Sequence, residues 1–166
     1  MAATVQLWEK NNVSPTATDK TAGTIRFKNA DDPAVDLNNP MVKPAVVSPS
    51  VVDWSFEKWL RFVVTGGSYT QITGVKFYMD GANGWTGVNL WAKAVTAFTN
   101  PAVPTSSSGF TNAFTYTSGS PLTLGAGPFT STGEKADHLV MAMEVTDQAV
   151  GGVLTAETLT IAWDEI

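Results

Sequence analysis

The sequence has no cysteine, a single histidine and little charge. Without cysteine, the chain cannot form disulfide bonds, thiolate metal sites or a cysteine nucleophile. His138 is the one imidazole available for acid–base chemistry, and no Gly-x-Ser-x-Gly nucleophile motif accompanies it. Charged residues make up 15% of the chain, well below the roughly 25% of an average globular protein. The sequence is therefore poor in the groups from which active sites are built.

Two further absences concern the partners of the protein. Its 10 Lys and Arg are outnumbered by 15 Asp and Glu, whereas a protein that binds nucleic acid needs a basic face. No segment approaches the about eighteen apolar residues of a transmembrane helix, and the first residues lack the pattern of a secretory signal. We therefore expect no nucleic-acid partner and no membrane partner. A role outside the cell would require release by lysis or within a particle.

Short segments of alternating apolar and polar residues dominate the sequence, and this alternation is typical of half-buried β-strands. The densest region, residues 54–98, holds four of the six Trp. Strands are expected at residues 4–8, 23–29, 54–65, 72–79, 88–98, 110–117, 138–147 and 153–163. Apolar residues on both faces of 54–65 predict a central strand. The last two strands, joined by residues 148–152, are expected to form a closing hairpin.

These elements predict an all-β fold, in which one domain spans residues 1–166. We expect an antiparallel two-sheet sandwich, jelly-roll-like, with about eight strands and long loops rich in Pro, Gly, Ser and Thr. Two segments stand apart from this pattern. One is an N-terminal segment, residues 1–22, with a short strand that we expect at an edge of a sheet. The other is a proline-rich arm or loop, residues 30–53, because its prolines exclude a central strand or a regular helix.

Candidate catalytic groups are few. Glu144 and Glu157 would face each other across the predicted hairpin, and a carboxylate pair of this kind can cleave glycosidic bonds. Solvated outward positions explain both residues without a site. His138 beside Asp137 is interpreted as a surface residue at the end of a strand. The sequence therefore predicts no catalytic residue, and the protein is not expected to be an enzyme.

Ligand sites are equally sparse. Residues 31–36 and 80–84 offer oxygen ligands at short spacing, but neither matches a calcium-binding loop, and Asp-Gly and Asn-Gly are common in β-turns. We expect no metal site and no cofactor. Among the tryptophans, Trp85 lies in a glycine-flanked turn and is the candidate for stacking on a sugar, while the others are explained better by a core or a subunit interface.

Five stretches resemble a known family, the small virion structural proteins of tailed double-stranded DNA bacteriophages. The resemblance spans most of the chain, is weakest in residues 31–53 and 101–133, and carries no catalytic or binding signature. The stretches are TIRFKNA (24–30), KWLRF (58–62), GVKFYMDG (74–81), GVNLWAKA (87–94) and LTAETLTIAWDEI (154–166).

The resemblance implies a structural role in the virion, with assembly in the host cytoplasm. The leading expectation is a capsid decoration (cement) protein, a homo-oligomer with the trimer as its expected form, which bridges subunits of the major capsid protein. The N-terminal segment and residues 31–49 are the expected contact elements, because extended segments can add to the edge of a sheet. Alternatives are a tail, baseplate or head–tail accessory subunit, and a carbohydrate-binding module for host attachment.

Overall fold

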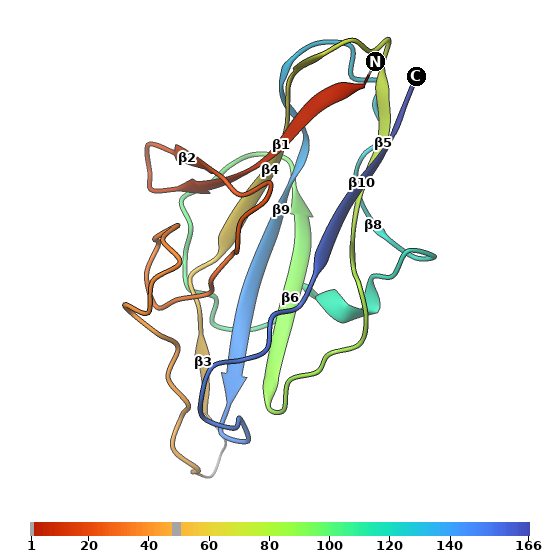
Figure 1. Cartoon of the computed structure of the whole chain (residues 1–166). Coiled ribbons are helices and arrows are strands. Elements are labelled where there is room, and N and C mark those ends of the chain that lie inside the picture. The colour runs from red at the N-terminus through yellow and green to blue at the C-terminus, as the bar shows by residue number, and fades with distance from the viewer. Residues whose placement is uncertain (1, 48–50) are drawn as a thin grey trace.

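The chain folds into two antiparallel β-sheets, as the sequence predicts (Figure 1). A computed structural model describes residues 2–47 and 51–166. The helix found there is one 3-10 turn, Ala113–Thr115, and no helix in this part of the chain is long and apolar enough to cross a membrane. The ten strands are β1 (Ala3–Asn11), β2 (Thr16–Asp19), β3 (Val52–Trp54), β4 (Lys58–Gly67), β5 (Ile72–Met79), β6 (Val88–Val95), β7 (Thr111–Asn112), β8 (Leu122–Gly125), β9 (Gly133–Thr146) and β10 (Leu159–Glu165).

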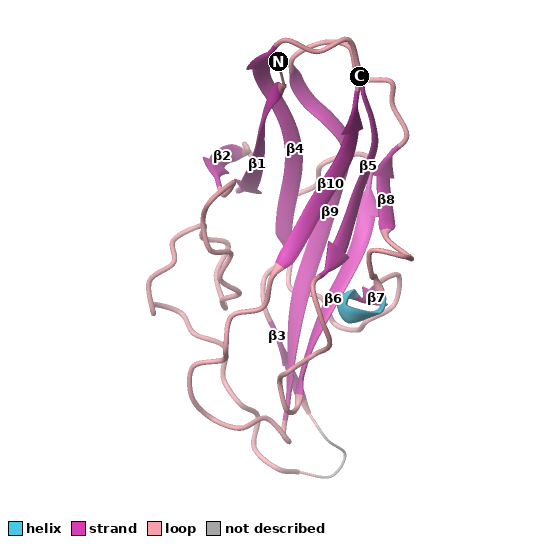
Figure 2. Cartoon of the chain, turned by 45° about the vertical axis from the view of Figure 1, so that its right-hand side comes forward, coloured by secondary structure: helices cyan, strands magenta, loops and turns pink. Residues whose placement is uncertain are grey.

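The two sheets differ in width. The larger sheet has the order β2-β1-β4-β9-β6-β7, and β3 pairs with the end of β9. The smaller sheet has the order β10-β5-β8. The chain crosses from the larger to the smaller sheet after β4 and returns after β5, so neighbours in sequence face each other across the core. Figure 2 shows the smaller sheet packed over one part of the larger sheet and the loops of residues 20–47 beside it.

Alternate residues of the strands form the hydrophobic core. Strand β4 contributes Leu60, Phe62 and Val64, and all three side chains are buried. From the smaller sheet, β5 contributes Val75 and Phe77, neither of which is exposed. This is the packing that period-two alternation predicts for a sandwich. Both faces of β4 are covered, as expected for a central strand, because Trp59 on its outer face packs against Phe98 of the loop that follows β6.

The predicted closing hairpin is wrong. Strand β9 pairs with β4 on one side and β6 on the other, so neither of its edges is open to β10. Strand β10 pairs instead with β5 in the smaller sheet. Glu144 on β9 and Glu157 ahead of β10 therefore do not face each other across a hairpin. Periodicity identified both strands but not their partners, since partner choice depends on edges that distant strands occupy.

Two expectations about the N-terminal region also need correction. Strand β1 lies between β2 and β4 rather than at an edge, so residues 3–19 of the N-terminal segment contribute two strands to the larger sheet. Residues 23–29 do not form a strand, although Ile25 and Phe27 pack against the core as their alternation predicts. Alternation identified these two buried side chains, but no strand lies alongside to pair with this segment. Sequence patterning also missed the short strands β2, β3 and β8. Of the strand expected at residues 110–117, only β7 is present, and the 3-10 turn follows it.

Candidate interaction surface

The proline-rich arm carries most of the exposed apolar side chains. Residues 30–47 are irregular, as their prolines predict, while Pro49 lies outside the described residues. Of twelve large hydrophobic residues that are exposed in the described chain, seven lie in residues 35–52, and two more lie in the connection between β9 and β10. The nine residues are Val35, Leu37, Val42, Val46, Val47, Val51, Val52, Val150 and Val153.

The exposed apolar residues of segments 41–47 and 51–52 and of the connection between β9 and β10 lie toward one end of the molecule (Figure 1). In Figure 1, residues 41–47 and the connection between β9 and β10 lie at the end opposite to the N- and C-termini. The exposed side chains are large; Val46 keeps 73% of its surface exposed and Val153 keeps 82%. Concentrated apolar surface of this kind marks interaction sites on soluble proteins. The arm is therefore the candidate functional surface of this chain.

At the base of the arm (residues 28–36), Asp32 and Asp36 contact the buried side chain of Lys28. The Lys28 Nζ lies 2.8 Å from Asp32 Oδ2 and 2.7 Å from Asp36 Oδ1, and the Lys28 side chain is fully enclosed. Hydrogen bonds to these two carboxylates raise the pKa of Lys28. The same lysine holds the pKa values of Asp32 and Asp36 below their usual range, and backbone N–H donors at Ala34 and Asn38 add to the effect.

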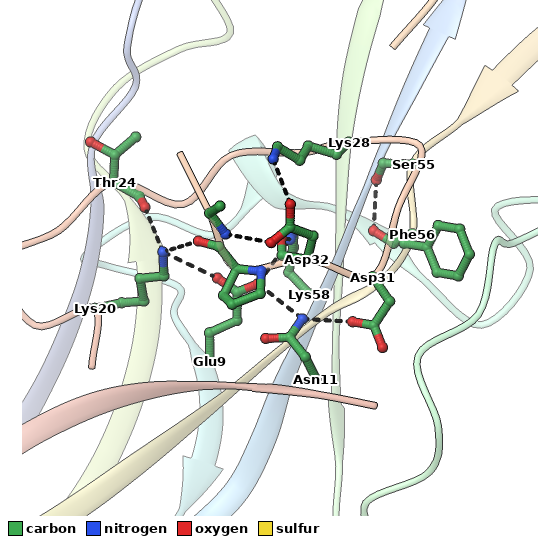
Figure 3. Close-up of polar contacts among 12 residues, drawn as sticks. Glu9, Asn11, Lys20, Thr24, Lys28, Asp31, Asp32, Ser55, Phe56 and Lys58 are labelled. Carbon is green, nitrogen blue, oxygen red and sulfur yellow. Dashed lines mark hydrogen bonds and ion pairs between the residues drawn. The ribbon is translucent and has the colours of Figure 1, made fainter. Parts of the chain in front are cut away.

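A second group of charges ties the arm to the larger sheet (Figure 3). Glu9 and Lys58 both project from its core-facing side, and the Lys58 Nζ lies 2.8 Å from Glu9 Oε1 with neither side chain exposed. The Lys58 ammonium also donates to the Asp32 carbonyl at 2.7 Å. Lys20 lies 3.7 Å from the other Glu9 oxygen and donates to the carbonyls of Thr24 and Pro33. Buried cations thus hold the backbone of the arm in a fixed path.

Hydrogen bonds to Asp53, at the end of the arm in β3, fix a further part of the arm. The carboxylate of Asp53 accepts hydrogen bonds from the Asn29 side chain at 3.2 Å and from the Val42 backbone N–H at 2.9 Å. The arm is consequently held at both its base and its return. Val35 and Val42 are therefore presented on a backbone whose path these contacts fix.

An apolar groove lies between the arm and the smaller sheet. It encloses about 880 Å³. Its walls come from the core-facing side of the larger sheet, from β10 and the segment before it, and from residues 20–41. Phe62 of the larger sheet and Trp163 of β10 both line the groove, and their ring centroids lie 5.3 Å apart. Met41 lines the groove from the arm. The groove lies beside β10, where the three-stranded smaller sheet does not extend over β1.

The side chain of Trp85, the candidate for sugar stacking, packs against other residues of the protein. Its indole N–H donates to the Thr155 carbonyl at 2.9 Å, and its ring meets Phe114 edge to face with centroids 5.6 Å apart. The side chain packs against the hydrophobic core and is half-buried. These contacts give Trp85 a structural role, and sugar stacking remains a prediction.

The other candidate residues do not converge on one site. His138 is buried within β9, so the expectation of a surface position is wrong; Nδ1 lies 3.2 Å from Arg61 Nη1. Burial lowers the His138 pKa, and the charge of Arg61 adds to this effect. Glu144 accepts hydrogen bonds from Asn89 and Trp91.

The carboxylates of residues 31–36 bind the chain's own donors. Asp31 accepts hydrogen bonds from the Asn11 side chain and the Asn12 backbone N–H, while Asp32 and Asp36 bind Lys28. Across the described ranges 2–47 and 51–166, no three His, Asp or Glu side chains are grouped so that they could hold a metal ion. The acidic residues of this segment thus contribute to fixing the arm.

Alternation by itself did not reveal the buried charges, although the sequence contains a signal for two of them. Glu9 continues the alternation of Val5 and Leu7, and Lys58 precedes Leu60 at the same spacing. Both charges thus occupy positions that should face the core. A charge in such a position is rarely buried unless it is paired. The partner could not be identified without the pairing of β1 with β4.

Comparisons with known protein families, with characterised proteins and with solved structures each find no match to this chain.

Proposed function

We propose that this chain is a non-enzymatic structural subunit of a phage particle, and specifically a capsid decoration (cement) protein. In this role it binds the outer surface of the assembled head and bridges neighbouring subunits of the major capsid protein. The observation that carries the proposal is the ordered arm with its exposed Val and Leu side chains. The sequence resemblance to virion structural proteins directs the choice of partner.

The fixed path of the arm supports this role. An interface segment that is ordered before binding loses less conformational entropy when the complex forms. Lys28, Lys58 and Asp53 hold the arm in place, so its apolar residues are available as a preformed surface. The N- and C-termini lie at the other end of the molecule (Figure 1), which leaves the arm end unobstructed by them.

The mechanism requires no bond to be made or broken. A protein that binds the assembled lattice but not free subunits stabilises the lattice by mass action. Apolar contacts between the arm and its partner supply the attraction, and loss of these contacts on disassembly makes separation less favourable. Decorated heads should therefore resist heat better than undecorated heads.

The first test is immunogold labelling of purified particles with an antibody against this chain. Gold distributed over the head supports the proposal. Gold confined to the tail contradicts it and favours a tail, baseplate or head–tail accessory subunit.

A binding test addresses the surface itself. Purified protein is added to heads that lack it, and bound protein is measured after sedimentation of the heads. A Val35→Asp/Val51→Asp variant should bind at least about tenfold more weakly, because these two residues are 51% and 49% exposed on the arm. The matched control is Val103→Asp, because Val103 is also exposed, at 44%, but lies outside the arm. Equal loss in the control would contradict a specific role for the arm.

A further inference from the structure

We propose that the apolar groove beside β10 receives residues 42–47 of the arm of a second copy of this chain, added as an extra strand to the smaller sheet. This inference rests on the proposed role as a subunit of an assembly. It assigns a site for self-association and names both surfaces that meet there.

The free edge of β10 faces the groove. Strand β10 pairs with β5 alone among the described strands. The Asp80 N–H donates to the Thr158 carbonyl at 3.0 Å, so the backbone groups of Thr158 face β5. Because these directions alternate along an antiparallel strand, the N–H and C=O groups of Leu159 and Ile161 face the opposite side. They form an edge to which another strand can add.

The core also has room for such a strand. The smaller sheet has three strands and the larger sheet has seven. Val5 and Leu7 of β1 line the groove and are only partly buried. Phe62 of β4, by contrast, is already covered by Trp163 of β10. An extended segment beside β10 would bury Val5 and Leu7 further. It would also extend the smaller sheet over β1.

The shape of the groove favours a single extended segment over the edge of a whole second sheet. Its far wall is formed by the protein's own residues 20–41, so the space beside β10 is bounded on both sides. Residues 42–47 of the arm are irregular and outside any strand. At about 3.3 Å per residue, these six residues span about 20 Å, close to the about 23 Å of the seven-residue β10.

The sequence of the arm suits an edge position. Val42, Pro44 and Val46 would share one face of an extended segment, and Val42 and Val46 are 60% and 73% exposed in the single chain. Pro44 lacks an N–H, which is tolerated on an edge strand when that position points away from the ladder. In that arrangement Lys43 and Ala45 present their backbone groups to β10.

The charges on the two surfaces are complementary. Lys43 lies in the middle of the arm segment, and Glu157 belongs to the wall of the groove. Neither residue takes part in the seven ion pairs found in the described chain. Arg26 also contributes to the wall, and its buried Nε has no acceptor among the described residues. An incoming segment with a lysine and free carbonyl oxygens would match both groups.

This contact joins two different surfaces, so the association is head-to-tail. Such an interface closes into a ring if the rotation between copies permits it. Each copy would donate residues 42–47 and accept those of another, and the exposed Val35, Val51 and Val52 of the arm would remain available to bind the head. The trimer expected from the sequence resemblance is one such ring.

Disulfide trapping tests the contact directly, because the natural chain contains no cysteine. Two single variants, Val46→Cys and Leu159→Cys, are purified, mixed and oxidised. Leu159 lines the groove and is on the core-facing side of β10, the side on which Val46 would be buried. Mixed dimers on a non-reducing gel support the proposal. The control pairs Val46→Cys with Thr117→Cys, an exposed residue ahead of β8, next to Tyr116, whose carbonyl accepts a hydrogen bond from the Met79 N–H on the side of β5 away from β10. No mixed dimer, or an equal yield with the control, overturns it.

A charge exchange provides a second test that does not depend on cysteine. Sedimentation equilibrium of the purified protein should show concentration-dependent association. Lys43→Glu and Glu157→Lys should each weaken association by about tenfold, and the double variant should recover most of it. A monomer at all concentrations, or no recovery in the double variant, overturns the proposal.

The same experiments separate this inference from the proposed function. A monomer that still binds heads through its arm would refute self-association and leave the decoration role intact. An oligomer in which residues 42–47 bind the groove of a second copy, but which fails to bind heads or tails, would support the proposed self-association. It would refute the proposed role in the particle.

Discussion

Lys58 and Glu9 meet on the core-facing side of the larger sheet, where the Lys58 Nζ lies 2.8 Å from Glu9 Oε1 and both side chains are fully buried. Transfer of two charges from water to the interior is unfavourable unless further polar contacts accompany the pair. Here Lys58 also donates to the Asp32 carbonyl, which belongs to the arm. The buried pair therefore positions a surface segment as well as joining two strands.

Removal of the Glu9 charge should destabilise the protein strongly. In Glu9→Gln, the buried ammonium groups of Lys58 and Lys20 lose their carboxylate, and a broken buried pair costs about 3–5 kcal/mol. Urea unfolding measures the change. Glu134→Gln is the matched control: Glu134 pairs with Lys10 but is 35% exposed, so its loss should cost less than about 1 kcal/mol. Equal effects of the two variants would contradict the special role of the buried pair.

Low pH should weaken the contacts of Lys28 with Asp32 and Asp36 and so destabilise the base of the arm. Lys28 lowers the pKa values of Asp32 and Asp36, so the contribution of these carboxylates is present above the ordinary Asp pKa of about 4. It is lost as the pH falls through the lower folded-state pKa values. Amide hydrogen exchange of residues 28–42, referenced to β9, should show loss of protection in this acid range. Asp32→Asn/Asp36→Asn should lack this acid-induced step, whereas an unchanged step in that variant would contradict the assignment.

The buried imidazole of His138 should give stability a second dependence on pH. Burial and the Arg61 charge lower its pKa, so the folded state holds it neutral while the unfolded state takes a proton below about pH 6.5. Stability from this residue is therefore lost as the pH falls through that value. His138→Phe retains an aromatic ring beside Trp59 and should reduce the stability difference between pH 7.5 and 5.5. An undiminished difference in this variant would assign the effect to other groups.

Asp53→Ala tests whether the ordered state of the arm matters for binding. The variant removes the acceptor for Asn29 and for the Val42 N–H but leaves the hydrophobic core intact. The midpoint of thermal unfolding should change by only a few degrees. Binding to heads that lack the protein should weaken by about tenfold, because the arm must be ordered on binding. Unchanged binding would show that the Asp53 contacts are unimportant for recognition.

Trp85 variants distinguish packing from sugar stacking. Trp85→Ala should cost about 3 kcal/mol or more, because the indole packs against the core and donates to Thr155. Trp85→Phe preserves much of the packing and should cost less. Binding to a glycan array that is lost in Trp85→Ala but kept in an equally destabilised core variant such as Leu124→Ala would favour the carbohydrate-binding alternative. Absence of any glycan signal from the natural protein would remove it.

The sequence by itself determined the fold class and most of the strands. Alternation in residues 72–79 predicts β5 with its observed bounds, since a half-buried strand needs one apolar and one polar face. The prolines of residues 30–47 likewise exclude regular structure there, because proline lacks an N–H and fixes its own backbone. These are local properties, so a single sequence reveals them.

Only the tertiary structure decided which strands pair and where the candidate surface lies. The edges of β9 are taken by strands from distant parts of the chain, and this sends β10 to the smaller sheet. The same arrangement leaves the groove beside β10 and brings Glu9 to Lys58 and the arm. Alternation assigns a side chain to a face but carries no information about the strand or loop opposite. The sequence therefore predicts that the arm is irregular, but only the folded structure shows where the arm lies and what holds it there.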